Sequence, residues 1–459
     1  MNKKIVMIGA GVANINAALT LVDGGYPGEL ITIIDKGKDP YNRKPSEVME
    51  GFGGAGLFSD GKYTYKHNEV GGQLVKYCSE EMADELINQG LENLKRFHPE
   101  PDKIMFSNPI EEPEFIKPYF NLRMSPTWHI GTDYLLPLGQ AWYNYLVEEG
   151  VNFEWETEVT DVIFELQEIY LKNQEDYWIG GVRDEFVDHL VQLSNLTPYD
   201  ILIVGAGKSG IDFTNKLIKE HKLKTEPKPI QFGVRFEAPQ EHFQKLIDIS
   251  YDFKLYKKIN DRISLRTFCS NSGAAFVAVE ETYGNHSYNG HSKKDPKLKN
   301  GMVNFGIMME IKGIEEPFKW SRKAVELLQK DGTGLFYSPN SNRVPSKTSE
   351  GEYVKCTQVP SLNPLYEAIG DYAIDIEDFI VDMQKILPTL KEDWAVYFPE
   401  IKYLSEEVLV NYEDLSLIDY PNVHFVGDSL SARGIAVSCA QGILASLAIL
   451  KKCGIYNIK

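Results

Sequence analysis

The sequence predicts an α/β protein with two domains: a Rossmann-like domain built from separated stretches of the chain, and a second, mixed α+β domain. Three observations indicate this fold. A strand–glycine turn–helix–strand unit opens the chain, a Gly-x-Gly-x-x-Gly segment follows an apolar run near residue 205, and a strand ending in Gly-Asp precedes the last helix. The length of 459 residues also favours two domains, because a single core seldom exceeds about 250–300 residues.

The composition is that of a globular chain with a strong acidic balance. Hydrophobic residues make up 43% and charged residues 25%, and 48 Lys and Arg stand against 66 Asp and Glu, a net charge of −18. This charge argues against a nucleic-acid surface that relies on bulk electrostatics, although a local basic groove remains open. We therefore expect a small-molecule substrate. No feature of the sequence indicates an oligomeric state.

The cysteines and the apolar runs indicate the compartment. The five cysteines are widely spaced and none forms a Cys-x-x-Cys pair, so we predict neither a zinc knuckle nor any other metal site. Few cysteines in a long chain are typical of a reducing compartment. No apolar run reaches the roughly 18 residues that a membrane span needs. We expect a cytoplasmic protein without a membrane span.

The first 35 residues predict a dinucleotide-binding βαβ unit. Residues 4–9 form an apolar run, 12–22 have helical spacing, and 30–34 form a second apolar run that Asp35 closes. This order of strand, glycine turn, helix, strand and acidic residue is that of the Rossmann fingerprint, in which the acid binds ribose hydroxyls. The alternative is a plain α/β crossover with a glycine-rich turn.

The glycines of the first turn have separate tasks. We expect Gly9 to make the tight turn, and Gly11 to let a pyrophosphate approach the positive end of the helix. Asn14 stands where the fingerprint has its third glycine. An Asn fits there after a small shift, and its amide can also face a phosphate.

A second glycine-rich segment follows soon after. Residues 51–61 contain five glycines, Gly53 and Gly54 among them, so the loop can lie close to a flat ring or a phosphate. Composition alone favours a surface loop. The position just after the βαβ unit and Arg43 favours a cofactor loop instead.

The segment from Gly205 to Gly210 is a complete Gly-x-Gly-x-x-Gly after a strand. It indicates either a second nucleotide site, for NAD(P)H, or the strand that returns to the first sheet. No apolar strand closed by a well-placed acid follows, and Pro227 and Pro229 interrupt the region. We favour the returning strand, so NAD(P)H as electron donor lacks a clear second site.

The C-terminal region completes the cofactor prediction. A strand ends in Gly427-Asp428, and a small-residue helix follows Gly434 and Ile435. This matches the closing motif of FAD enzymes, in which the Asp accepts a hydrogen bond from a ribityl hydroxyl and the helix start points at the flavin and pyrophosphate. Together with the N-terminal unit, it predicts FAD rather than NAD.

These segments resemble, in the same order over most of the chain, the uncharacterised FAD-dependent dehydrogenases of the glutathione-reductase-like FAD fold. Further segments carry the resemblance: Asp35-Lys-Gly-Lys-Asp39, His129-Ile-Gly-Thr-Asp133, Gly233-Val-Arg235-Phe-Glu237-x-Pro239, Arg266-Thr-Phe-Cys269 and Arg433-Gly434-Ile435. The motifs and the resemblance imply these cofactor-binding residues: Gly9, Gly11, Asn14, Asp35, Lys36, Arg43, Gly53, Gly54, Val159, Gly205, Gly427, Asp428, Gly434 and Ile435.

The chain departs from this family in its substrate region. Relatives carry Cys-Pro-Gly-Gly where this chain reads Cys269-Ser-Asn-Ser, and a cysteine-bearing insert before the Gly53 loop is absent. The resemblance therefore implies FAD but lends no substrate.

The motifs predict a discontinuous FAD-binding domain of residues 1–72, 129–235 and 405–459, and a substrate or cap domain of residues 73–128 and 236–404. Ligand sites favour such domain junctions. We expect His129 to act there as a base, and Arg266 to act as a clamp for an anionic or carbonyl group. Arg235 is a further candidate clamp.

The leading functional hypothesis is an FAD-dependent oxidoreductase or dehydrogenase acting on a small organic substrate, with an amine or amino-acid-like group as one candidate. This chemistry is common on the fold, but fold alone does not assign it. One alternative is a flavoenzyme without net redox, or one acting on a modified group carried by a macromolecule. Another is a protein in which FAD is structural.

Overall fold

The structure is a computed structural model. It describes residues 3–44, 47, 49–58, 61–65, 74–107, 111–123, 126–173, 196–250, 252–282, 285–292, 296–330, 334–338, 346–348, 351–391, 393–402, 406–432 and 434–455. The chain divides into two units: unit 1 comprises Met1–Asn108, Ser125–Glu226 and Ser405–Lys459, and unit 2 comprises Pro109–Met124 and Pro227–Leu404.

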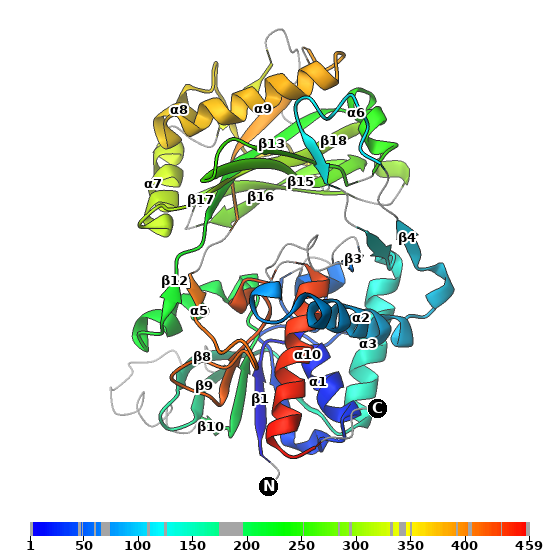
Figure 1. Ribbon diagram of the computed structural model, residues 1–459, viewed down its shortest axis with the longest axis vertical. Coiled ribbons are helices and arrows are strands. Elements are labelled where there is room, and N and C mark those ends of the chain that lie inside the picture. Colours follow the sequence, from blue (N-terminus) through cyan, green and yellow to red (C-terminus); the bar gives the residue numbers. More distant parts are fainter. Residues whose placement is uncertain are drawn as a thin grey trace. The chain divides into compact units, whose positions relative to one another are not determined.

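Unit 1 is built on a five-stranded parallel sheet in the order β23-β11-β1-β2-β7 (Figure 1). The strands are β1 (Ile5–Ile8), β2 (Ile31–Ile34), β7 (Asn152–Glu154), β11 (Ile201–Val204) and β23 (Val423–Phe425). Strands β1, β2 and β11 are buried along their whole length, which explains why their sequences are apolar without alternation.

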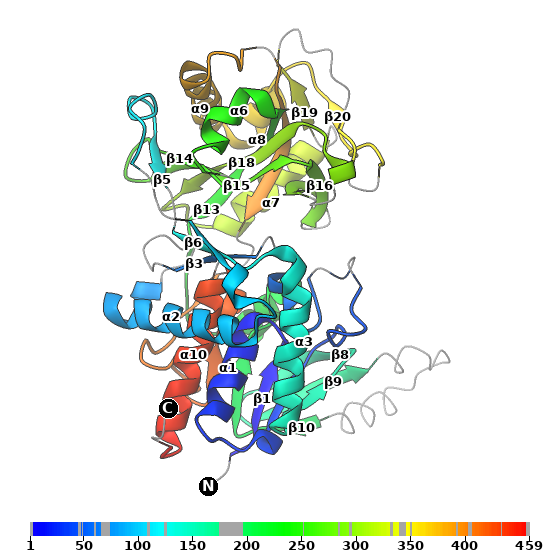
Figure 2. The same cartoon turned by 90° about the vertical axis from the view of Figure 1, so that its right-hand side faces the viewer.

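Helices cover one face of this sheet, and the small antiparallel sheet of β8, β9 and β10 lies on the other side (Figures 1 and 2). The helices among the described residues of unit 1 are α1 (Val12–Asp23), α2 (Glu80–Phe97), α3 (Thr132–Glu148), α5 (Ile211–Glu220) and α10 (Ile435–Lys452). Of these, α5 contacts β8. Helix α10 packs directly on α1. The two backbones are so close that a Cβ added to Gly442 would lie 2.0 Å from the Ala13 carbonyl oxygen. Glycine is therefore required at this contact.

Helix α10 is long and apolar enough to cross a membrane, but 72% of it is buried inside the structure. A core helix passes the same test, and the packing of α10 on α1 identifies it as one.

The remaining strands of unit 1 form three small sheets. They are β3 (Lys62–Thr64), β6 (Thr127–His129) and β4 (Met105–Ser107); β8 (Thr157–Ile163), β9 (Glu168–Asn173) and β10 (Leu196–Pro198); and β12 (Thr225–Glu226) with β22 (Glu407–Val408). Short 3₁₀ turns are η1 (Gly28–Leu30), η2 (Gly54–Phe58), η3 (Leu74–Lys76), η4 (Pro101–Lys103), η6 (Lys208–Gly210) and η8 (Gly427–Leu430).

Unit 2 is a mixed α+β unit with an eight-stranded sheet in the order β20-β19-β21-β13-β18-β15-β14-β5. Its strands are β5 (Asn121–Arg123), β13 (Ile230–Pro239), β14 (Lys254–Lys258), β15 (Ile263–Gly273), β18 (Met302–Ile311), β19 (Gly334–Tyr337), β20 (Thr357–Gln358) and β21 (Ala395–Lys402). A separate hairpin pairs β16 (Ala275–Thr282) with β17 (Asn285–Ser292), and η7 (Pro296–Leu298) follows it.

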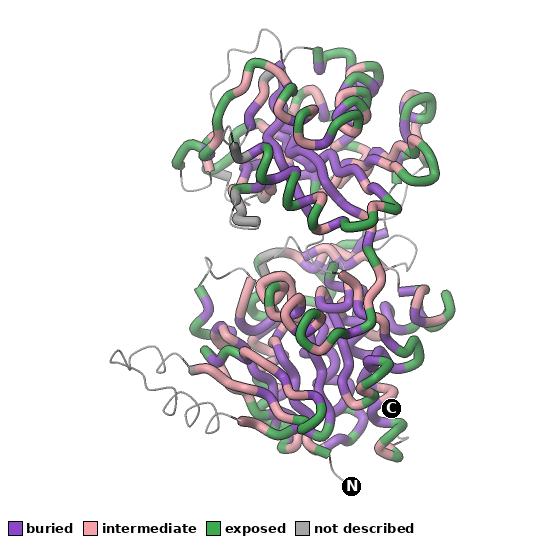
Figure 3. Tube along the Cα trace, turned by 90° about the vertical axis from the view of Figure 1, so that its left-hand side faces the viewer, coloured by how far each residue is buried: buried purple, intermediate pink, exposed green. Residues whose placement is uncertain are grey.

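Among the described residues of unit 2, the helices that pack against its sheet are α6 (Gln240–Ile247), α7 (Pro317–Lys330), α8 (Asn363–Ile369) and α9 (Tyr372–Ile386). Their apolar side chains form one core with alternate residues of β13, β15, β18 and β21. Unit 1 has a core of its own around its parallel sheet, and Figure 3 shows both buried cores in purple.

The predicted α/β fold is confirmed, with a parallel Rossmann-like sheet in one unit and a mixed α+β arrangement in the other. The predicted boundaries differ from those of the two units. Residues 73–108 belong to unit 1, because α2 packs on α10. Residues 227–235 belong to unit 2, because β13 pairs with β18 and β21.

Two stretches have local structure that their composition does not indicate. Residues 152–163 are extended but interrupted at Trp155–Glu156, where Glu156 has a φ of 52°, and so form β7 and β8. Residues 285–292 are polar, yet they form β17, because backbone pairing with β16 outweighs their composition. Residues 174–195 lie outside the described residues.

The sheet of unit 1 contains a buried histidine that makes its stability depend on pH. His424 on β23 lies with its Nδ1 atom 2.7 Å from the Asp414 carbonyl oxygen, and burial lowers the pKa of His424 from 6.5 to about 4. Because the unfolded chain takes up a proton below pH 6.5 and the folded chain does not, stability is lost as the pH falls from 6.5 towards 4. The loss is on the order of 3 kcal/mol, from about 1.4 kcal/mol per pKa unit.

We expect His424→Gln to flatten the dependence of unfolding free energy on pH in urea titrations between pH 7.5 and 4.5. His221→Gln is the matched control, because this half-buried histidine belongs to the same unit and contacts the Phe164 ring instead of a backbone carbonyl. Equal pH slopes for His424→Gln and the wild type would contradict the assignment.

Candidate cofactor site

The turns that follow four parallel strands of unit 1 carry the predicted motif residues. Strands β1, β2, β11 and β23 are followed by Gly9, Asp35, Gly205 and Gly427. Because the strands are parallel neighbours, these residues share the carboxyl edge of one sheet. Ligands of open α/β sheets bind at this edge.

Gly9 is required by the fold itself. Its φ is +91°, and an added Cβ would lie 2.6 Å from the Gly205 carbonyl oxygen. Its backbone N–H donates to the Ile34 carbonyl at 2.8 Å. The tight turn predicted at Gly9 is therefore present, and it brings the ends of β1, β2 and β11 together.

Gly11 is not required by the fold. It has a φ of −72°, and an added Cβ would meet only the Gly205 carbonyl oxygen, at 3.9 Å. No side chain caps the N-terminus of α1, which begins directly after Gly11. The first N–H groups of a helix have no partner within it. Because glycine has no side chain, the N–H groups at the start of α1 stay open to a ligand, and this polar cradle fits a phosphate group.

Asp35 is buried and fixed by three backbone donors. Its Oδ2 accepts from the Ala10 N–H at 2.7 Å, and its Oδ1 accepts from Gly37 at 2.7 Å and Gly51 at 2.8 Å. Each carboxylate oxygen has two lone pairs. One acceptor position on Oδ2 therefore remains for a ligand hydroxyl, and the carboxylate also ties three loops together.

Asn14 fits at the third-glycine position because its neighbour has no side chain. A Cβ added to Gly205 would lie 2.8–2.9 Å from the atoms of the Asn14 amide. The Asn14 Nδ2 atom donates to the carbonyl oxygens of Ile8 at 2.9 Å and Gly9 at 2.7 Å. The amide N–H groups are thus engaged by the turn itself, so a contribution of Asn14 to binding would act through the shape of the turn.

The glycine loop predicted near the cofactor does lie against the first turn. Gly53 forms a bridge with Gly11, and its N–H donates to the Ala10 carbonyl at 2.7 Å. Arg43 is buried and donates to the carbonyl oxygens of Phe52 at 2.6 Å and Gly54 at 2.8 Å. Burial lowers the pKa of Arg43 to about 10. Arg43 therefore holds the loop in shape through backbone contacts.

Lys36 and Val159 lie on segments next to Asp35. The Lys36 ammonium donates to the Ser209 carbonyl at 3.3 Å and pairs with Glu50 at 3.2 Å. Val159 is buried on β8, just before a bulge in its pairing with β9. The start of β8 is tied to the acid, because the Thr157 N–H donates to the Asp35 carbonyl at 3.1 Å.

The C-terminal motif forms a second glycine turn. Gly427 has a φ of +66° and donates its N–H to the Gln441 side chain at 2.8 Å. Asp428 is half-buried in η8, and no described side chain pairs with its carboxylate. Gly434 has a φ of +87° and precedes Ile435, the first residue of α10, whose N-terminus has no side-chain cap. Arg433 lies outside the described residues.

Two polar residues that contact the turns were not predicted. Ser429 accepts the Ala206 N–H at 3.0 Å and so links the turns after β23 and β11. Gln441 orients the Gly427 N–H from within α10. A single amide inside an otherwise small and apolar helix was the available signal for Gln441, because buried polar groups need partners.

The second glycine motif belongs to the first sheet. Strand β11 pairs in parallel with β1 and β23, so the prediction of a returning strand is confirmed. The large sheet of unit 2 is antiparallel except for the β19–β20 pair, and so does not form an independent doubly wound nucleotide domain.

The two catalytic candidates lie in different units. His129 ends β6 in unit 1 and precedes α3 by two residues. Arg266 lies on β15 in unit 2, with its guanidinium carbon 5.3 Å from the centre of the Phe268 ring. Their convergence and their catalytic roles stay predictions. Within the described ranges, no group of three or more His, Cys, Asp or Glu side chains could hold a metal ion.

No protein-family model matches the chain. An uncharacterized protein from Clostridium beijerinckii is 23% identical to it over 492 residues, which cover 97% of this chain and 80% of that protein.

Several solved structures align with the chain at low similarity. A flavoprotein/dehydrogenase from Cytophaga hutchinsonii has a TM-score of 0.40 and 11% identity, over 98% of this chain and 79% of that one. Glycine oxidase from Geobacillus kaustophilus has a TM-score of 0.40 and 10% identity, over 98% and 95%. L-proline dehydrogenase from P. horikoshii has a TM-score of 0.38 and 14% identity, over 98% and 94%. Similarity of this size assigns neither a ligand nor an activity to this chain.

Proposed function

We propose that the chain is an FAD-dependent oxidoreductase that acts on a small organic substrate. One observation carries the proposal. Two helices, α1 and α10, begin after glycines at the carboxyl edge of the same parallel sheet, and no side chain caps either N-terminus. Two such helix starts favour negatively charged or electron-rich groups, because their N–H groups lack partners and their dipoles are positive there.

The residues at this edge offer hydrogen-bonding groups that complement the chemical groups of FAD. The α1 N-terminus behind Gly11 would bind the pyrophosphate, and the remaining acceptor on Asp35 would bind a ribose hydroxyl. The Asp428 carboxylate would accept from a ribityl hydroxyl, and the N–H groups that follow Gly434 would bind the electron-rich edge of the flavin. Bound flavin supplies hydride-transfer chemistry, and the protein supplies orientation and electrostatics.

The finer proposal is a substrate with an amine or amino-acid-like group. Arg266 supports it, because its half-buried guanidinium contacts the Phe268 ring and no described carboxylate forms an ion pair with it. A planar guanidinium without an ion-pair partner is suited to binding a substrate carboxylate through two hydrogen bonds. Substrate-dependent loss of flavin absorbance without oxygen, across a panel of amines and amino acids, tests this.

The cofactor proposal predicts that the purified chain carries FAD, identified by its absorption spectrum and by chromatography after denaturation. We expect Asp428→Ala to weaken FAD binding about 10- to 100-fold, because a hydrogen bond to a charged acceptor contributes about 1.5–3 kcal/mol. Asp419→Ala is the matched control, since this exposed carboxylate pairs with Lys224. A folded chain without flavin, or one that binds only NAD, would contradict the proposal.

A further inference from the structure

The sheet of unit 2 has one apolar face and one polar face. Side chains alternate between the two faces of a strand. Phe232, Val234 and Phe236 of β13 belong to the helix-packed core, so Arg235 between them points to the opposite face. The same alternation places Asn304 of β18 and Glu400 of β21 on that face, away from the helices.

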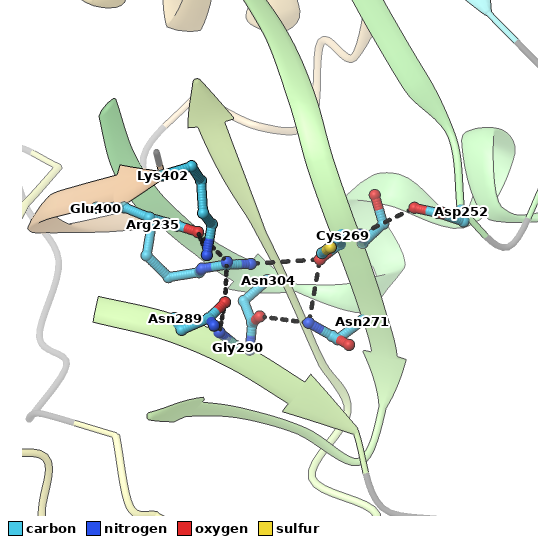
Figure 4. Close-up of polar contacts among 10 residues, drawn as sticks. Arg235, Asp252, Cys269, Asn271, Asn289, Gly290, Asn304, Glu400 and Lys402 are labelled. Carbon is cyan, nitrogen blue, oxygen red and sulfur yellow. Dashed lines mark hydrogen bonds and ion pairs between the residues drawn. The ribbon is translucent and has the colours of Figure 1, made fainter. Parts of the chain in front are cut away.

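A buried polar cluster lies on this face, and Figure 4 shows its contacts. We call it the Arg235 network; its members are Arg235, Asn271, Asn289, Asn304, Glu400 and Lys402. The Glu400 Oε1 atom accepts from Arg235 at 2.6 Å and lies 3.1 Å from the Lys402 ammonium. Arg235 also donates to the Cys269 carbonyl at 3.3 Å, so two sequence motifs that are far apart in the chain meet here.

Two cations of the network share one carboxylate. Arg235 and Lys402 both contact Glu400 Oε1, and all three side chains are at least nine-tenths buried. A second buried carboxylate on this face, Glu237, lies two residues from Arg235 along β13 and accepts from the Ser346 hydroxyl. Two buried donors, Arg235 Nε and Asn304 Nδ2, and one acceptor, Glu400 Oε2, have no hydrogen-bond partner among the described residues. Buried polar groups without partners cost free energy, and a small anion can satisfy the two donors.

Strand β17 lies directly on the network. The Asn289 Oδ1 atom accepts from Arg235 Nη2 at 2.9 Å. A Cβ added to Gly290 would lie 2.2 Å from Asn304 Oδ1 and 2.9 Å from Arg235 Nη1. Among the described residues, β17 forms backbone strand pairing only with β16 and does not join the large sheet. Side-chain contacts, including the Tyr288–Tyr397 ring pair at 5.5 Å, hold the hairpin on this face.

We propose that Arg235 binds a carboxylate group of a small ligand, and that Asn289 occupies the position of that carboxylate when no ligand is present. The Asn289 amide oxygen is a neutral acceptor on a guanidinium. A carboxylate oxygen makes the stronger, charge-assisted bond to the same donor, and its second oxygen can take the unused Arg235 or Asn304 donor. The carboxylate thereby displaces Asn289 and places a further negative charge beside the two cations that share Glu400.

The test uses acetate as the carboxylate probe and two variants with opposite expected effects: Asn289→Ala removes the internal acceptor, and Asn289→Asp turns it into a carboxylate. Thermal unfolding of the full chain is measured with rising sodium acetate against sodium chloride at equal ionic strength. We expect acetate to raise the unfolding midpoint of the wild type by about 2–4 °C for each tenfold excess over its dissociation constant. Asn289→Ala should increase the acetate-specific shift, because no internal group then competes for Arg235.

Asn289→Asp should raise the midpoint without acetate and remove the acetate-specific shift, because the chain then supplies the carboxylate itself. Asn260→Ala is the matched control in the same unit: this side chain accepts from the backbone N–H groups of Arg262 and Ile263 in a turn, and its acetate response should equal that of the wild type. An acetate effect no larger than that of chloride in Asn289→Ala, or a lower midpoint in Asn289→Asp, would overturn the proposal. Flavin content is measured on the same samples, so that absent FAD with a preserved acetate response contradicts only the proposed cofactor.

Discussion

Gly11→Ala is expected to weaken FAD binding about 10- to 100-fold while leaving the folded apoprotein at least as stable as the wild type. Because Gly11 has a φ of −72° and an added Cβ would have one neighbour, at 3.9 Å, the substitution introduces neither strain nor a clash. Restricting the unfolded chain should even stabilise the apoprotein, by about 0.4–1 kcal/mol. The new methyl group would occupy the cradle at the α1 N-terminus. Filling a close-packed contact costs about 1–3 kcal/mol, which is about 10- to 100-fold in affinity.

Gly9→Ala is the contrasting variant. Its Cβ would lie 2.6 Å from the Gly205 carbonyl oxygen, and its φ of +91° is strained for alanine. Strain alone should lower the unfolding free energy by about 1–2 kcal/mol, and the clash adds to it. Urea titration of both apoproteins and titration of each with FAD, followed by flavin fluorescence, separate the two effects. If Gly11→Ala binds FAD as the wild type does, the cradle is not the cofactor site.

The elements of unit 1 could be predicted because each has a strong local signal. The apolar runs that became β1, β2 and β11 are buried along their whole length. Gly9 after β1 and Gly207 in the turn after β11 have positive φ angles that other residues rarely adopt. The return of β11 to the first sheet could be predicted because no strand that ends in an acidic residue follows it in the sequence. Local sequence reports such features directly, because strand periodicity and glycine conformation are properties of short segments.

Features that depend on distant contacts could not be predicted in the same way. The helix α2 was assigned to the second domain, and only its packing on α10 shows that it belongs to unit 1. Asp35 was expected to bind a ribose, yet it also accepts from Ala10, Gly37 and Gly51. Arg43 was expected at the cofactor, and its guanidinium also donates to the loop carbonyls of Phe52 and Gly54. In each case the decisive partner is set by the tertiary fold.

The Arg235–Glu400 pair is another such feature, because its members are 165 positions apart. Glu400→Gln is expected to lower the unfolding free energy of unit 2 by about 3–5 kcal/mol, since removing one member of a buried pair leaves an uncompensated charge. Here two charges lose their partner, because Lys402 shares the same carboxylate oxygen. Urea titration followed by hydrogen exchange of peptides from β13 and β18 reports on unit 2 specifically.

Two further variants separate loss of the charge pair from loss of side-chain volume. Glu310→Gln on β18 should change stability by no more than about 0.5 kcal/mol, because its partly exposed carboxylate lies 4.0 Å from Lys312 and a Gln oxygen can still accept from Gln231. Replacing both members, as Arg235→Met with Glu400→Leu, should recover part of the lost stability, because an apolar pair of similar volume needs no charge compensation. Recovery is partial because the buried Lys402 ammonium still lacks its carboxylate. If Glu400→Gln proves no less stable than Glu310→Gln, Arg235 is already neutralised by another group, and its need for an anion disappears as well. If Glu400→Gln is destabilised as expected, acetate should restore part of the loss, because an external carboxylate can then neutralise the two cations that Glu400 served.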